Sequence, residues 1–262
     1  QRSRVPTSTG RWEAQCEVYT GLAGVAVAYM RAGVFCREVG QNPVAAHDYF
    51  QRARNVAVTC LEGTGRNREV SFFCGAPGCL ALACVTSLLS GEDAAARSYL
   101  QQLLAWENQA LRHKDDELLF GRAGYLYALL WVRQHCGTPV ADFNTPLQRV
   151  AERLVATGQA RAARSYNSWP LMWHCFNEPY VGAAHGVLGI LVMLLHCFDL
   201  LGADSQQLVS ATVEKLLEQR FRSGNLPIIL GERHDEHIHW CHGAPGLPAL
   251  AAAAEAPAAS AA

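Results

Sequence analysis

A cysteine flanked by histidines is the clearest candidate for chemistry in this sequence. The segment His239-Trp-Cys-His-Gly-Ala-Pro-Gly246 places Cys241 between two imidazole side chains. Thiolate and imidazole are ligands that zinc prefers, so Cys241 is a candidate metal ligand. A buried cysteine just before a helix is an equally good interpretation. Zinc needs three or four ligands, and adjacent residues rarely all face one ion, so further ligands would have to come from elsewhere.

His185 and Glu117 could move protons. Imidazole side chains serve as general acids and bases, so His185 could protonate a carbanion-like intermediate or deprotonate a thiol. A lone histidine before a buried helix is more often structural. Glu117 could orient His185, but it follows Lys114-Asp115-Asp116, a charge run that is also typical of a solvated surface. The residues alone leave both alternatives open.

Three other features are weaker candidates. Arg122 could bind a substrate carboxylate, although we interpret it as surface-exposed. Core packing is the better interpretation of Cys74. The run His234-Asp-Glu-His237 has the residue types of a metal site, but a solvated loop is the favoured interpretation.

A repeated Gly-x-x-Gly pattern indicates the elements that position these residues. It begins at positions 21, 75, 121, 186 and 243, with spacings of 54, 46, 65 and 57 residues, each about two helices and two loops. A strongly apolar segment follows each pattern, which predicts helices buried on most sides. Glycines three residues apart let neighbouring elements approach closely. Five such units indicate a repeat architecture.

More polar, amphipathic stretches alternate with the apolar ones. They cover about residues 44–60, 92–112, 146–163 and 205–221. Alternating inner and outer helices predict an all-α fold, either an α/α toroid or a plain α-solenoid; periodicity alone favours neither. In the toroid, Cys74, Glu117, His185 and Cys241 would gather at one end of the ring. We divide the chain into a helical domain, residues 1–247, and an Ala-rich low-complexity tail, residues 248–262.

Composition excludes some classes of function. A formal net charge of -1 gives no electrostatic case for binding nucleic acid. The sequence contains no apolar run long enough for a transmembrane segment. Ten cysteines scattered among apolar residues read as buried thiols rather than a secreted disulfide scaffold, which indicates a reducing compartment. We expect the protein to lie in the cytoplasm, where it could also attach peripherally to the plasma membrane.

Seven blocks resemble the eukaryotic LanC-like proteins (the lanthionine synthetase C-like family), relatives of the bacterial lanthionine cyclases. The blocks span nearly the whole chain: Val18–Gly24, Ser71–Gly75, Glu117–Leu130, Pro170–Met172, Tyr180–Gly186, Ser223–Asn225 and His239–Gly246. The segments Gly182-Ala-Ala-His-Gly186 and Trp240-Cys-His-Gly-Ala-Pro-Gly246 are the most specific. The resemblance implies a double α/α toroid of seven inner and seven outer helices, of which about five repeats are visible here.

The resemblance also implies a zinc site and roles for single residues. Cys241 matches one family zinc ligand, whereas the Cys-His pair of the later Gly-x-Cys-His-Gly block has no counterpart in these 262 residues. His185 matches the catalytic histidine, and Glu117 aligns with a carboxylate near it. His242 is not a ligand in the family. Arg122 is the candidate contact for glutathione.

The implied reaction is peptide modification, in which a thiol adds to a dehydroamino acid. For a eukaryotic-type member we expect zinc-dependent addition of glutathione to dehydroalanine or dehydrobutyrine residues of a dehydrated peptide or protein. With one family zinc ligand, we expect a chain truncated at its C-terminus and impaired in this activity. The alternative is a non-catalytic LanC-like module that binds glutathione or a protein partner.

Overall fold

The computed structural model describes residues 16–65, 67–136 and 142–255, and this part of the chain is helical. Its strand-like features are two isolated bridges, Cys175 with Glu178 and Tyr180 with Ile229. The helices are, in chain order, α2 (Leu22–Glu38), α3 (Pro43–Gly63), α4 (Ala76–Leu89), α5 (Asp93–Ala105), α6 (Glu107–Arg112), α7 (Arg122–Cys136), α8 (Asn144–Ser165), α9 (Val187–His196), η1 (Phe198–Leu200), α10 (Ala203–Leu217), η2 (Ala244–Gly246) and α11 (Leu247–Glu255).

Every Gly-x-x-Gly pattern lies at the start of a helix, as predicted. The first four patterns begin α2, α4, α7 and α9, and the fifth covers η2 just before α11. The amphipathic stretches form the intervening helices: α3, α5 with α6, α8 and α10. The expected alternation of apolar and amphipathic helices is therefore confirmed.

The second glycine of the pattern lets a helix start against a backbone carbonyl. A Cβ atom on Gly78 would lie 1.8 Å from the oxygen of Phe72, and one on Gly189 would lie 1.9 Å from the oxygen of Ala183. Real Cβ atoms do not approach oxygen so closely. These positions need glycine for clearance, which is the physical basis of the repeat.

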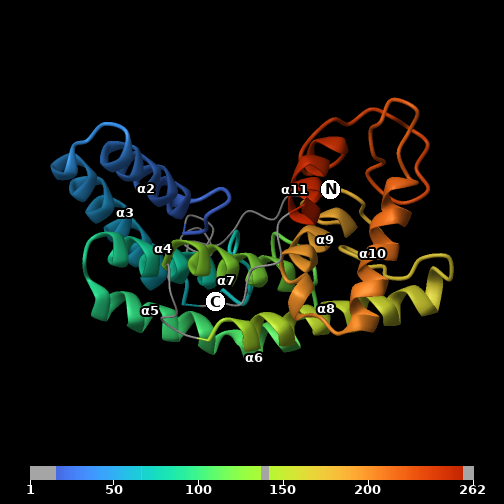
Figure 1. Cartoon of the computed structure of the whole chain (residues 1–262), viewed down its shortest axis with the longest axis horizontal. Coiled ribbons are helices and arrows are strands. Elements are labelled where there is room, and N and C mark those ends of the chain that lie inside the picture. Colours follow the sequence, from blue (N-terminus) through green and yellow to red (C-terminus); the bar gives the residue numbers. More distant parts are fainter. Residues whose placement is uncertain (1–15, 66, 137–141, 256–262) are drawn as a thin grey trace, which may run out of the picture. The chain divides into compact units, whose positions relative to one another are not determined.

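The described residues form two compact units, and the boundary between them falls inside α7. Of the described residues, the first unit contains those up to 108 and residues 128–136, and the second contains residues 109–127 and 142–255. In the first unit, α2 and α3 lie side by side, and α3, α4 and α5 pack in succession (Figure 1). In the second unit, α9 packs against α10 and α11.

The helices differ in how completely they are buried. In α4, twelve of fourteen residues are buried, and eight of the ten residues of α9 are buried. Helix α2 departs from the prediction, because Leu22, Val25 and Phe35 are 47%, 43% and 59% exposed. Helix α2 packs against α3 and α4, which cover one side of it.

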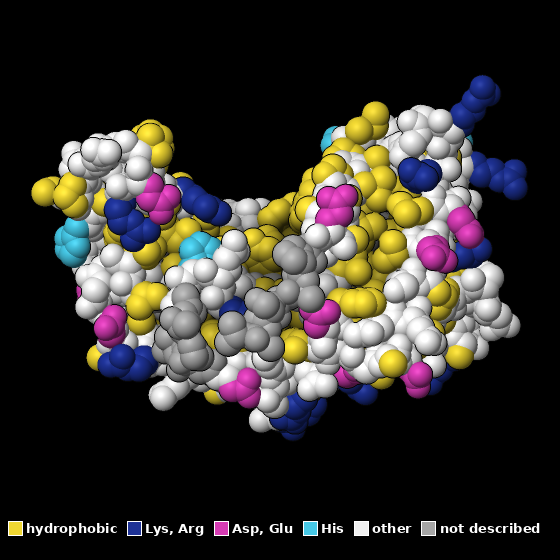
Figure 2. Space-filling model, in the orientation of Figure 1, with side chains coloured by type: hydrophobic (Ala, Val, Ile, Leu, Met, Phe, Trp, Pro, Cys, Tyr) yellow, Lys and Arg dark blue, Asp and Glu magenta, His cyan; other side chains and the backbone are white. Residues whose placement is uncertain are grey.

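Residues 248–255, assigned from the sequence to an Ala-rich tail, belong to helix α11. Leu250 and Ala253 are its buried residues. Figure 2 shows apolar side chains gathered around α9 and α11. Residues 256–262 lie outside the described part of the chain.

Candidate functional site

Glu117 lies in the turn before α7 and its carboxylate is enclosed by backbone donors. One oxygen, Oε1, accepts the N–H groups of Phe120 (2.5 Å) and Gly121 (3.1 Å), and Oε2 accepts the N–H of Leu119 (2.9 Å). Glu117 is 1% exposed. The interpretation of Glu117 as part of a solvated charge run is therefore wrong. The carboxylate caps the turn that starts α7, whose first N–H groups lack partners within the helix.

His185 lies in the equivalent turn before α9 and contacts the same carboxylate. Its Nδ1 is 2.8 Å from Oε2 of Glu117, and the imidazole is 18% exposed. A backbone hydrogen bond from Leu118 N to Ala184 O (3.3 Å) also joins the two turns. A carboxylate can only accept, so Nδ1 carries the proton of this hydrogen bond. The other ring nitrogen, Nε2, is then left to exchange a proton with a substrate.

Aromatic rings surround His185. Phe120 stacks on the imidazole with ring centroids 5.7 Å apart and an interplanar angle of 18°. Phe176 and Tyr180 pack at 5.6 and 5.9 Å. The ring of His242 lies 6.4 Å from that of His185 and 5.6 Å from that of Tyr180. These rings exclude water from one side of the imidazole and strengthen its hydrogen bond to Glu117.

Cys175 is a third polar group at this site. Its Sγ lies 3.8 Å from Nδ1 of His185, and ligand atoms of Glu117, Cys175 and His185 lie within 4.8 Å of one another. By proximity these three residues could hold a metal ion. A carboxylate has about four lone-pair sites, however, and three backbone N–H groups and His185 already occupy those of Glu117. The hydrogen-bonded arrangement therefore fits the geometry better than a metal centre.

The chemistry of Cys175 agrees with that assignment. Burial, followed by the nearby Glu117 carboxylate, raises the pKa of the Cys175 thiol to about 12. The side chain is 3% exposed. At neutral pH the sulfur is therefore a neutral thiol, which is neither a nucleophile nor a good metal ligand. No sequence pattern points to Cys175, which is one of ten cysteines scattered along the chain.

Cys241 lies in a segment packed against the turn before α9. A Cβ atom on Gly182 would be 2.1 Å from the carbonyl oxygen of Cys241, so glycine is needed there for this approach. Cys241 itself is half-buried. Within the residues that the structure describes, Cys241 belongs to no group of three neighbouring metal-ligating side chains. The donors present around it therefore do not complete a zinc site.

Asn225 fixes the segment that carries Cys241. Its Nδ2 donates to His237 O (3.0 Å) and to Oδ1 of Asp235 (2.8 Å), and its Oδ1 accepts the N–H of Ala244 (2.8 Å). Asn225 is 5% exposed, so its amide is buried, whereas its partners Asp235 and His237 lie in an exposed segment. Sequence reasoning assigned no role to Asn225, although it lies in one of the blocks that carry the family resemblance.

His242 lies next to Cys241 and has a pKa below the ordinary value of histidine. Burial lowers its pKa, and the neighbouring His185, His237 and His239 lower it further. Its Nδ1 is buried and finds no hydrogen-bond partner among the described residues. A buried imidazole without a partner favours the uncharged form.

Arg122 is buried rather than surface-exposed as predicted. It is 2% exposed, and its guanidinium pairs with Asp116 and donates to the carbonyl oxygen of His113. Burial raises the pKa of Asp116, while Arg122 opposes that change. The arginine thus pairs with a partly buried carboxylate inside the same turn. Contact with glutathione through Arg122 stays a prediction.

The remaining sequence candidates lie elsewhere. Residues 233–237 are exposed, which confirms the interpretation of the His234–His237 run as a solvated loop. Cys74 is buried beside α4 in the first unit, in agreement with core packing.

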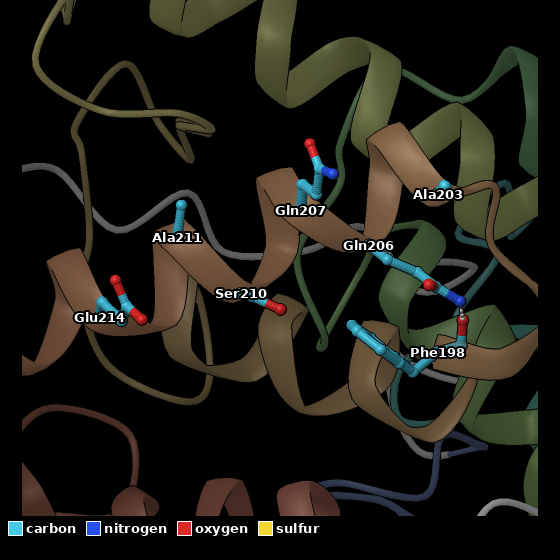
Figure 3. A pocket seen from close by; sticks show the side chains of 7 residues that line it. All are labelled: Phe198, Ala203, Gln206, Gln207, Ser210, Ala211 and Glu214. Carbon is cyan, nitrogen blue, oxygen red and sulfur yellow. Dashed lines mark hydrogen bonds between the residues drawn. The ribbon is translucent and has the colours of Figure 1, made fainter.

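A separate pocket of about 440 Å³ lies on η1 and α10. Figure 3 shows that its polar side chains include Gln206, whose Nε2 donates to the carbonyl oxygen of Phe198 (2.9 Å). Its lining includes none of the residues around His185.

In the described part of the chain, no helix is both long and apolar enough to cross a membrane.

Known proteins are similar to this chain in sequence. Residues 13–256 match the family described as "Lanthionine synthetase C-like protein". The chain is 33% identical over 234 residues to "Glutathione S-transferase LANCL1" of Danio rerio, covering 87% of this chain and 55% of that protein. It is 29% identical over 237 residues to "LanC-like protein GCL1" of Arabidopsis thaliana, covering 86% and 52%. The chain thus spans about half the length of these curated relatives.

A solved structure supports the fold. "Nisin cyclase" superposes with a TM-score of 0.65 at 14% identity, covering 94% of this chain and 68% of the other. The all-helical fold is that of the α/α toroid, which confirms the toroid over the solenoid. Family match, relatives and fold agree, and the chain belongs to the lanthionine synthetase C-like family.

Proposed function

We propose that this protein adds the thiol of glutathione to dehydroalanine or dehydrobutyrine residues of peptides or proteins. The hydrogen bond between Glu117 and His185 is the observation that carries the proposal. This hydrogen bond fixes the imidazole and leaves Nε2 without a hydrogen-bond partner among the described residues, beside rings that exclude water from one side. The similarity to a glutathione S-transferase and the fold shared with nisin cyclase add to this support.

In this reaction the S–H bond of the thiol adds across the carbon–carbon double bond. A new S–C bond forms at the β carbon, the π bond breaks, and a proton arrives at the α carbon, so no oxidant or reductant is needed. Nε2 of His185 takes the thiol proton or delivers the α proton. Throughout, Nδ1–H stays bonded to Glu117, which stabilises positive charge on the imidazole.

Zinc, which the family resemblance implies, would favour the thiolate form of glutathione. Cys241 is the residue of this chain proposed to hold it. The described residues supply no complete ligand set around Cys241, and no step above depends on the metal.

Mass spectrometry of a dehydroalanine peptide incubated with glutathione and the protein tests the proposal. We expect one glutathione adduct per dehydroalanine, formed about 10²- to 10⁴-fold more slowly with His185→Asn. His174→Asn is the matched control, because His174 is a half-buried histidine of the same unit that hydrogen-bonds to Tyr166. An equal loss in both variants would contradict a catalytic role for His185.

The alternative is a non-catalytic module that binds glutathione or a protein partner. Isothermal titration with glutathione separates the two: saturable binding without adduct formation supports the module, whereas adduct formation that depends on His185 contradicts it.

A further inference from the structure

A tight hairpin places an aromatic ring beside His185. Cys175 and Glu178 exchange both backbone hydrogen bonds, at 3.1 and 2.9 Å. The two residues between them, Phe176 and Asn177, have φ values of 51° and 65°. A two-residue hairpin loop with two consecutive positive φ values is typical of a type I′ turn.

The sequence of this turn is a poor match to its conformation. Type I′ turns prefer Asn-Gly or Asp-Gly, because glycine and asparagine tolerate the left-handed region. Asn177 meets that preference, but a bulky residue such as Phe176 is an outlier there. The other positive-φ residues in the described part of the chain are glycines and Gln41. Phe176 therefore costs stability, and such outliers concentrate at functional sites.

The ring of Phe176 is exposed as well as strained. It is 68% exposed, whereas Cys175, one residue earlier, is 3% exposed and faces His185. The Phe176 ring meets His185 edge to face at 66° and Phe120 at 6.3 Å. One edge of the ring thus packs on the site, and much of its surface faces solvent.

We propose that Phe176 is a specificity-determining residue whose exposed ring binds an apolar side chain next to the dehydrated residue of the acceptor peptide. The assignment of the acceptor rests on the proposed function. A residue that reacts at His185 brings its neighbours within reach of a ring 5.6 Å away. An aromatic face gains most from apolar groups, and exposed aromatic rings often dominate binding energy. Glutathione, a charged tripeptide, would gain little from it.

Binding of unreactive peptides tests this proposal without the reaction. Two labelled peptides carry alanine in place of dehydroalanine and differ in one flanking residue, leucine or serine. Fluorescence anisotropy with the full chain should show about tenfold tighter binding of the leucine peptide, as expected for burying one aliphatic side chain. Phe176→Asn should remove the preference, and Phe176→Tyr should keep it. Equal binding of both peptides to the wild-type protein would overturn the proposal.

Thermal unfolding provides a second readout. Asparagine suits the left-handed region, so Phe176→Asn should raise the melting temperature by about 2–4 °C while it removes the binding preference. Phe35→Asn is the matched control: Phe35 is 59% exposed in helix α2, and its replacement should give neither effect. A lower melting temperature for Phe176→Asn would mean that the ring is a structural element, and would overturn the proposal.

The two hypotheses can fail separately. A leucine preference that depends on Phe176, found without any glutathione adduct on the matching dehydroalanine peptides, would support the inference and contradict the proposed thiol addition. Adduct formation at equal rates on both peptides would support thiol addition and overturn the inference.

Discussion

The turns before α4 and α7 have the same backbone and different chemistry. In each, the first residue accepts the N–H of the glycine four positions later: Gly75 N to Ser71 O at 3.1 Å, and Gly121 N to Glu117 O at 3.0 Å. The side chain of Ser71 then accepts the N–H of Cys74 (3.0 Å). The longer side chain of Glu117 accepts three N–H groups and also reaches His185. One substitution in a repeated turn thus converts a structural cap into half of a proton-transfer pair.

The turn before α9 uses the same position in a third way. Gly186 N donates to Gly182 O at 3.1 Å, as in the other two turns. Because Gly182 has no side chain, the carbonyl oxygen of Cys241 can approach it. The three turns therefore share one backbone conformation and differ at the first position. Ser71 caps its turn, Glu117 supplies a carboxylate, and Gly182 leaves room for the carbonyl oxygen of Cys241.

The largest effect should come from breaking the shared framework. Gly189→Ala and Gly78→Ala place a Cβ atom within 2 Å of a carbonyl oxygen, so each should lower the free energy of unfolding by about 3 kcal/mol or more. Gly65→Ala is the control, since a Cβ there meets nothing within 4 Å. Urea unfolding measures all three. A Gly189→Ala variant as stable as Gly65→Ala would mean that the close approach is not required.

A smaller effect should separate the two turns. Glu117→Ala leaves buried N–H groups unsatisfied and removes the partner of His185. This change should lower the free energy of unfolding by about 3 kcal/mol. Ser71→Ala removes the hydrogen bond to the N–H of Cys74 and should lower the free energy of unfolding by about 1 kcal/mol. Urea unfolding at one pH compares them. Equal losses would show that the carboxylate acts only as a cap.

The smallest effect should be a pH dependence of stability. His242 and Cys74 occupy the same position, directly before the glycine of their turns, but only the imidazole titrates near neutrality. Burial lowers the pKa of His242 in the folded state, so the unfolded state binds the proton first as the pH falls. Stability should therefore fall from about pH 6.5 down to the lowered folded pKa.

His242→Gln should flatten that dependence, which melting temperatures between pH 5 and 8 would measure. Glu232, His185, His237 and His239 are the charged or titratable groups that act on His242. An unchanged pH profile in His242→Gln would show that His242 is not the source of the pH dependence.

Sequence patterns predicted the helices but only part of their packing. The five Gly-x-x-Gly patterns identified helix starts correctly, because the glycines report a local steric requirement that is visible in the chain. The exposure of Phe35 in α2 could not be predicted, because apolar periodicity does not show which neighbours cover a helix.

The sequence predicts those residues of the candidate site that a motif identifies one at a time, but not the contacts between them. His185 and Glu117 were named from their motifs, but their contact joins residues 68 positions apart. The prediction of an exposed Arg122 is wrong, because its partner Asp116 belongs to a charge run that is typical of a solvated surface, whereas the turn buries Arg122 and partly buries Asp116. Cys175 and Phe176 gave no signal, since their roles depend on a hairpin whose Phe-Asn loop lacks the usual turn residues.

The protonation state of His185 tests the central claim most directly. Long-range ¹H–¹⁵N correlation spectra of the neutral imidazole report which ring nitrogen carries the proton. The structure predicts a proton on Nδ1, held by Glu117, and a bare Nε2; Glu117→Ala should lose this preference. A proton on Nε2 in the wild-type protein would contradict the account, because Nδ1 could not then donate to the carboxylate.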